Sequence, residues 1–127
     1  MTKIQKLEDL KTWQEARKLA KILEEIIFLL PSKEEYNLKK HLRECKRDIP
    51  ANIAEGFGRF YYRDSVQFYR VATGSLNEVK SDIYLCLDEK YIPEDLFQKA
   101  FDQVEVVYKF LNGLLTSARK IKAVSHK

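Results

Sequence analysis

Apolar residues recur every three or four positions along most of the chain, which is the spacing of helices that bury one face. Four such stretches predict helices at residues 9–30, 33–57, 64–90 and 94–121. With 4 glycines and 3 prolines in 127 residues, the chain has little material for the turns of a many-stranded protein. We therefore predict an all-α fold, an up-down antiparallel four-helix bundle in a single domain over residues 1–127. The clearest apolar series belongs to the third helix and comprises Tyr69, Ala72, Leu76, Val79, Ile83 and Cys86.

Local patterns indicate where these helices begin, bend and end. A hydroxyl residue followed three positions later by glutamate is typical of a capping box, and it occurs at Thr12–Glu15 and at Ser32–Glu35. Pro50 lies inside the second helix, where its missing amide predicts a local kink. That helix is expected to end at Gly56 and Gly58, because glycine accepts the positive φ angles common at helix ends.

The first and fourth helices carry a second apolar row beside the main one. A row this wide covers more than one neighbouring helix, so the first helix either lies deep in the bundle or meets a second subunit. One row per helix is enough for the core of a lone four-helix bundle, so the second rows predict self-association over these two helices. The second rows comprise Leu19, Ile22, Ile26 and Leu29 on the first helix, and Phe101, Tyr108 and Leu115 on the fourth.

Charge and cysteine content limit the partners and the cellular compartment expected for the protein. A formal net charge of +4 and a pI near 9.0 permit attraction to nucleic acid without requiring it. Cys45 and Cys86 both fall on apolar rows, so we expect buried, reduced thiols in a cytoplasmic protein. The longest apolar run, from Ile26 to Leu30, is too short to cross a membrane, and no membrane partner is expected.

Three basic clusters are candidate contacts for nucleic acid: the outer face of the second helix, the corner after it, and the C-terminal stretch. Aromatic residues in the corner, Phe57, Phe60, Tyr61 and Tyr62, are suited to stacking on bases. Both features also have a purely structural interpretation, as solvated helix faces and as rings that close the end of the bundle or pack between subunits. The candidate basic residues are Lys39, Lys40, Arg43, Lys46, Arg47, Arg59, Arg63, Arg119, Lys120 and Lys122.

Polar residues near the corner are expected to hold the second and third helices together. Folding the third helix back on the second brings Glu78 near Arg43 and Arg47, and we expect it to pair with one of them. Asn52 and Glu55 are expected to cap or bind backbone groups at the corner.

Gly74 lies in the middle of the third helix, where glycine is less favourable than alanine by about 1 kcal/mol. Small neighbours such as Ser75 surround it in the sequence. We therefore expect another helix to approach closely at this position.

The residue pattern does not predict a metal, cofactor or catalytic site. The di-metal centre of four-helix bundles requires Glu-x-x-His on two helices, and neither His41 nor His126 follows a glutamate at that spacing. The two cysteines are on separate helices with no histidine at a ligand spacing, which makes a poor zinc site. The enzymatic alternative is a helical ribonuclease that uses Arg119 and His126, seven residues apart.

Three motifs resemble one known family. The run Asn-Ile-Ala-Glu-Gly-x-Gly-Arg at residues 52–59, Gly-Ser-Leu-x-Glu at 74–78 and Trp-Gln-x-Ala at 13–16 are similar to motifs of the 23S rRNA intervening-sequence proteins. The resemblance covers most of the chain. It implies a four-helix bundle assembled as a ring, commonly a pentamer, with no established enzymatic activity and encoded in bacterial genomes. The fold is also similar to accessory proteins of diversity-generating retroelements, which bind a reverse transcriptase and nucleic acid.

Together these observations predict a non-enzymatic, oligomeric binding or scaffold protein. The expected partner is RNA or a protein that handles nucleic acid. The alternatives are the helical ribonuclease and a purely structural assembly. The residues expected to serve structure in the family motifs are Asn52, Glu55, Gly56, Gly58, Gly74, Ser75 and Glu78.

Overall fold

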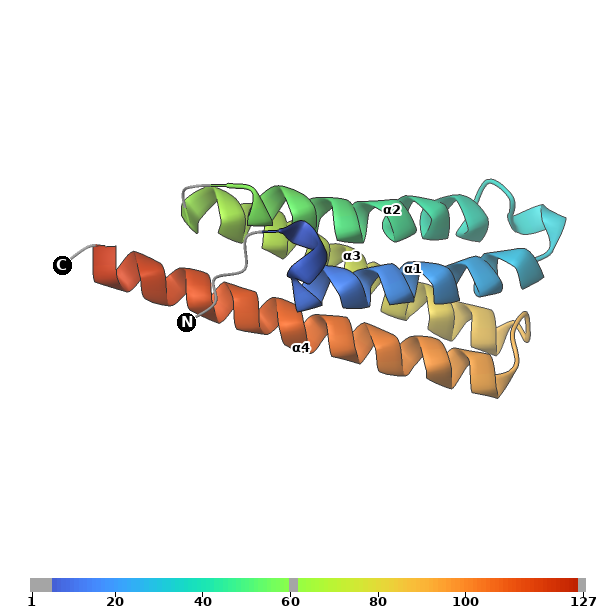
Figure 1. Cartoon of the computed structure of the whole chain (residues 1–127). Helices are drawn as coiled ribbons and strands as arrows, with labels where there is room; N and C mark the ends of the chain where they lie inside the picture. Colours follow the sequence, from blue (N-terminus) through green and yellow to red (C-terminus); the bar gives the residue numbers. More distant parts are fainter. Residues whose placement is uncertain (1–5, 60–61, 126–127) are drawn as a thin grey trace.

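The computed structural model describes residues 6–59 and 62–125, without the side chains of Tyr62 and of residues 119–125. No strand occurs in these ranges. Consecutive helices run antiparallel, and the first also packs against the last, so that each has two main neighbours (Figure 1). The predicted all-α, up-down four-helix bundle is confirmed. Its elements are η1 (Leu7–Asp9), α1 (Lys11–Leu29), η2 (Ser32–Glu34), α2 (Leu38–Phe57), α3 (Tyr62–Asp88) and α4 (Glu94–Ser125), where η marks a 3-10 turn.

The core is built from the predicted apolar rows. On α3 every member of the row from Tyr69 to Cys86 is at most 5% exposed. Leu42 on α2 and Leu111 on α4 belong to the same core and are fully buried. Each leucine buried in this way stabilises the fold by about 1.5–3 kcal/mol relative to an exposed one, so the rows that reveal the helices also hold the bundle together.

The second apolar row of α1 is buried inside the chain. Ile22 and Ile26 are covered because α1 lies between α2 and α4 and contacts both. On α4, Leu115 is also buried, and only Tyr108 and the α1 residue Leu29 remain substantially exposed. The inference that these rows await a second copy of the chain is therefore wrong, because the width of each row reflects two neighbours within one bundle.

Neither predicted capping box forms. No side chain caps the start of α1, and Thr12 and Glu15 are instead buried near its first turns. The second helix begins at Leu38 rather than at residue 33, because Ser32–Glu34 form a separate 3-10 turn. From Leu38 the helix continues past Pro50 to its end at Phe57.

The corner between α2 and α3 depends on close packing at Gly56. The Tyr69 ring lies against this glycine, so that a β-carbon at Gly56 would be 2.5 Å from Tyr69 Cε1. The Ser65 hydroxyl donates a hydrogen bond to the Gly56 carbonyl oxygen at 2.8 Å. Neither Gly56 nor Gly58 has a positive φ, so the expected reason for glycine here is wrong and close approach replaces it at Gly56.

The turn after α3 has the hydrogen bonds of a Schellman motif. The Tyr91 amide donates to the Cys86 carbonyl and the Lys90 amide to the Leu87 carbonyl, at 2.9 and 3.0 Å. Lys90 takes the left-handed conformation, with φ of 60°. The turn places the Tyr91 hydroxyl beside the Glu34 carboxylate of η2, to which it donates a hydrogen bond at 2.8 Å.

Candidate functional site

His41 is held between two carboxylates where α2 packs on α3. Its Nε2 lies 2.6 Å from Glu78 Oε2, and its Nδ1 bonds the Asp82 carboxylate. Glu78 and Asp82 are four residues apart and so occupy one face of α3, one turn from each other. A single imidazole ring thereby links α2 to two successive turns of α3.

Cys45 completes this group one turn after His41. Its sulfur lies 3.8 Å from His41 Nε2 and 3.9 Å from Glu78 Oε2. The donor atoms of these three residues all lie within 4.8 Å of one another. The expectation that neither cysteine has a histidine at a ligand spacing is wrong: His41 and Cys45 are four residues apart, and that signal is readable in the sequence.

The carboxylates and the burial of the cluster set the protonation of its members. The hydrogen bond to Asp82, assisted by the one to Glu78, raises the pKa of His41 and favours the imidazolium. Burial raises the pKa of Asp82, although its bond to His41 acts in the opposite direction. Burial also raises the pKa of the Cys45 thiol to about 12, so in the absence of a metal the thiol is protonated at neutral pH.

Glu78 therefore has a different partner from the one expected. It pairs with His41, whereas Arg43 Nη1 lies 2.7 Å from Glu35 and Arg47 Nε lies 3.4 Å from Asp48. Helical spacing correctly places Glu78 on the side of α3 that faces α2. It does not fix how far one helix is shifted along the other.

The other motif residues are placed as follows. The Asn52 side chain binds a backbone group, the Asp48 carbonyl one turn earlier in α2 at 2.8 Å. Glu55 forms an ion pair with Arg59 at 3.0 Å and is not a cap. Around Gly74, no heavy atom of the described residues that could obstruct a side chain lies within 4 Å of where a β-carbon would stand, so the expected close approach is not made by the described part of the chain.

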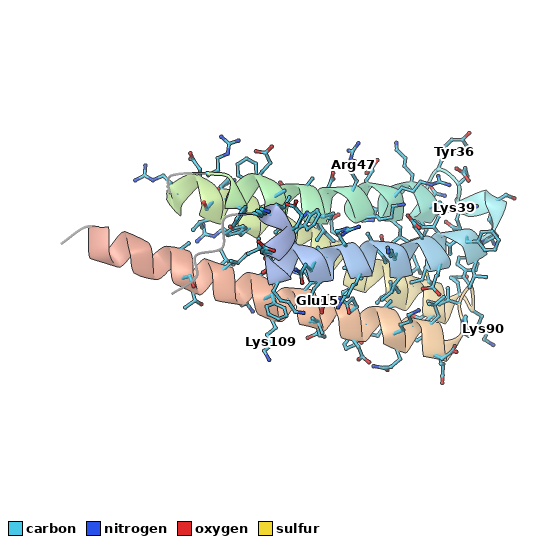
Figure 2. The ribbon with its side chains drawn as sticks, in the orientation of Figure 1. Glu15, Tyr36, Lys39, Arg47, Lys90 and Lys109 are labelled. Carbon is cyan, nitrogen blue, oxygen red and sulfur yellow. The ribbon has the colours of Figure 1, made fainter. Side chains whose placement is uncertain are left out.

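Five of the ten cations predicted to meet nucleic acid have acidic partners. Lys39 and Arg43 share Glu35, and Lys46 Nζ lies 3.0 Å from Glu24 Oε1. Figure 2 shows Lys39 near the boundary of α1 and α2, and Arg47 extending away from the bundle. Lys40 and Arg63 are exposed, Arg59 lies over the Phe68 ring, and Arg119, Lys120 and Lys122 fall on the last part of α4, where side chains are not described.

The aromatic corner is only partly described. Phe57 packs against the core, which agrees with the structural interpretation of that ring. Phe60, Tyr61 and the side chain of Tyr62 lie outside the described part of the chain, as does His126 of the ribonuclease alternative.

A basic surface on α1 was missed from the sequence. Arg17, Lys18 and Lys21 line a shallow depression on the outer side of this helix. Toward the other end of α1, Phe28 is 86% exposed and lines a second depression with Lys39, Arg43 and Lys46 of α2. We refer to these seven residues as the α1–α2 face. Its α1 cations were not predicted because acidic and apolar residues separate them along the helix, so that they form no basic run in the sequence.

Residues 8–113 match the family described as 23S rRNA-intervening sequence protein. The chain belongs to this family. The match takes in α1, α2, α3 and most of α4, and all three motifs of the predicted resemblance. No protein with curated annotation matches the chain. Within the described residues, no helix of this intervening-sequence protein is both long enough and apolar enough to span a membrane.

Proposed function

We propose that this intervening-sequence protein is a non-enzymatic RNA-binding protein that works as a cytoplasmic homo-oligomer. The observation that carries the proposal is the α1–α2 face, where an exposed aromatic ring of α1 lies beside three cations of α2 and where further cations line a second depression on α1. The family name, which refers to ribosomal RNA, supports RNA as the polyanion. A protein that handles nucleic acid is the competing partner.

The α1–α2 face has the chemistry that single-stranded RNA requires. Cations bind the phosphates, and an exposed ring such as Phe28 offers a surface on which a base can stack. Arg17 and Lys21 have no ion-pair partner among the described residues, and Arg17 lies over the Trp13 ring at 5.2 Å. These two cations are therefore free to meet phosphate groups.

The ion pairs of the face do not prevent RNA binding. Lys46 and Glu24 are partly exposed, and exposed pairs stabilise a protein by only about 0–1 kcal/mol. A phosphate can replace the carboxylate as the partner of the cation at little cost. The acidic neighbours do lower the net charge of the face, so we expect modest affinity with strong dependence on salt.

The buried thiols support a binding role over a catalytic one. Burial raises the pKa of both Cys45 and Cys86 to about 12, which keeps them protonated and poorly nucleophilic. Catalysis by the Arg119 and His126 pair remains the enzymatic alternative.

Self-association is supported by the outer side of α3 rather than by α1. Gly74 sits there in open space in mid-helix, as Gly113 does in α4, but Gly74 alone has exposed apolar residues at helical spacing on its side of the helix. Val71 and Leu85, three and eleven residues from it, are each 44% exposed. We propose that a second copy of the chain covers this side of α3, which gives the glycine and both apolar residues a partner.

The RNA-binding proposal is tested with a labelled single-stranded RNA and fluorescence anisotropy at two salt concentrations. The test variant replaces Arg17, Lys21 and Phe28 with alanine. The control variant is Lys109→Ala, because Lys109 is an exposed cation of α4 that extends from the opposite side of the bundle to Arg47 (Figure 2). We expect weaker binding for the triple variant only, and a denaturing gel should show intact RNA.

Three outcomes would contradict the proposal. Equal loss of affinity in the control would mean that RNA senses only the overall charge. Absence of salt-dependent binding would favour a protein partner or a purely structural assembly. Cleavage of the RNA that disappears in His126→Ala would establish the ribonuclease alternative.

A further inference from the structure

The geometry between α2 and α3 points to a zinc-type metal site formed by His41 Nε2, Cys45 Sγ and Glu78 Oε2. Histidine, cysteine and glutamate are all zinc ligands. The three come from two helices, so that one ion would fasten α2 to α3 at the surface of the bundle. This inference does not depend on RNA binding.

Two of the three distances between the donor atoms are already close to those between ligands in a tetrahedral zinc site. With zinc bonds of about 2.3 Å to sulfur and 2.0–2.1 Å to nitrogen or oxygen, the sulfur should lie about 3.5 Å from each other ligand. The observed separations are 3.8 Å to His41 Nε2 and 3.9 Å to Glu78 Oε2. An ion could therefore enter with only slight contraction around the sulfur.

The third distance, between His41 Nε2 and Glu78 Oε2, must increase. Glu78 Oε2 and His41 Nε2 are 2.6 Å apart because they share a hydrogen bond, whereas two ligands on one zinc ion lie about 3.3 Å apart. The Glu78 side chain is 57% exposed and so has room to move by this amount. Metal binding would replace the Nε2–H···O bond by one bond from each atom to the ion.

Asp82 supplies the group that orients the imidazole. Its carboxylate binds Nδ1 of His41 and holds a proton on that nitrogen, so that Nε2 is the nitrogen that gives up its proton and becomes the ligand when an ion binds. A carboxylate on the far side of a metal-bound histidine is the usual support of such sites. Asp82 is thus a positioning residue, and it does not itself touch the ion.

The ligand types decide which ions fit. A thiolate and an imidazole select Zn²⁺ or Co²⁺ over Mg²⁺ and Ca²⁺, which prefer oxygen ligands alone. Cys45 is buried while Glu78 lies at the surface, so the fourth position faces solvent and suits a water molecule. Binding releases the thiol proton of Cys45 and the Nε2 proton of His41 to solvent.

The chain contains a matched control for the test. Cys86 is also a free, buried cysteine in the bundle, but it belongs to no group of potential ligands among the described residues. We therefore compare Cys45→Ser with Cys86→Ser in protein stripped by a chelator. Both variants are first checked for retained helix content by circular dichroism.

The first measurement is titration with Co²⁺, followed by the absorption that a thiolate–cobalt bond produces. We expect one ion per chain in the parent protein and in Cys86→Ser, and no thiolate band in Cys45→Ser. Competition with a coloured chelator then gives the Zn²⁺ affinity, which we expect to fall about 10–100-fold in Asp82→Asn. Added Zn²⁺ should also raise the unfolding temperature of the parent protein, because it binds only the folded chain.

Two results would overturn the inference. If the parent protein shows no thiolate–cobalt absorption and takes up no Zn²⁺, the cluster is an ion-pair link between helices and nothing more. If Cys45→Ser binds Zn²⁺ as tightly as Cys86→Ser does, the ion resides elsewhere.

Discussion

Tyr69 and Gly56 pack so tightly across the corner between α2 and α3 that no side chain fits at the glycine. The Tyr69 ring is 5% exposed, and three of its carbon atoms would lie within 3.0 Å of a β-carbon on Gly56. The glycine of the Asn-Ile-Ala-Glu-Gly run is thus explained by packing between two helices. This contact fixes where α3 turns back on α2.

Gly56→Ala should destabilise the protein by about 1–3 kcal/mol, because the buried ring must be displaced. Urea unfolding followed by circular dichroism measures the loss. Gly113→Ala is the control: Gly113 lies in α4 with open space around it, so alanine there should stabilise by about 0.5–1 kcal/mol. Equal stability of Gly56→Ala and the parent protein would mean that the ring moves aside freely.

Gly74→Lys should reduce the mass of the assembly while leaving the chain folded. A side chain at Gly74 meets no obstruction from the residues that the structure describes, but it would project into a second copy seated on α3. Light scattering measures the mass, and Gly113→Lys is the matched control at the other open glycine. A monomeric parent protein, or equal masses for both variants, would refute self-association over this side of α3.

Replacing Arg17 and Lys21 with alanine should lower the salt dependence of RNA binding. Each phosphate contact on a single strand contributes about 0.7 to the slope of log K against log salt, so loss of two contacts should reduce the slope by about 1.4. Anisotropy titrations over a range of salt concentrations measure this slope. Unchanged slopes would show that phosphates bind other cations, such as Lys40 or Arg63.

Tyr91→Phe should destabilise the protein in a pH-dependent manner. The hydrogen bond to Glu34 raises the pKa of Tyr91 from 10.0 to about 12. Only the protonated phenol donates this bond, so its contribution is complete below about pH 10 and is lost as the pH rises toward 12.

The measurement is the urea midpoint of the parent protein and of Tyr91→Phe, at neutral pH and at alkaline pH. We expect the difference between them to shrink in alkali. Tyr36→Phe is the control, because the Tyr36 ring is 85% exposed. A difference that does not change with pH would assign the effect to packing of the ring.

The spacing of apolar residues was sufficient to predict the bundle, because the positions that a helix buries recur every three or four residues. The row from Tyr69 to Cys86 could be read directly, and every member is buried. The capping boxes did not form because their glutamates make other contacts. Glu15 is buried against the bundle, and Glu35 binds Lys39 and Arg43 instead of a backbone amide.

The candidate sites could not be predicted in full, because the spacing of residues along one helix does not give the position of its neighbour. The face of α3 that carries Glu78 could be predicted, but the shift of one helix along another decides between Arg43 and His41 as its partner. The spacing of His41 and Cys45 was readable, whereas the approach of Glu78 to both was not. The cations of α1 form no run in the sequence, and only the fold shows that they line one depression on the outer side of the helix.

The contact between α1 and α4 closes the bundle into a cycle in which every helix touches the one before and the one after it. Rotating the order of the helices along the chain would therefore preserve each pair of neighbours. Such a circular permutant, opened in the exposed link between α1 and α2 where Tyr36 projects into solvent, should fold to the same arrangement. The architecture thus depends on which helix surfaces pack together and not on the order of the helices along the chain.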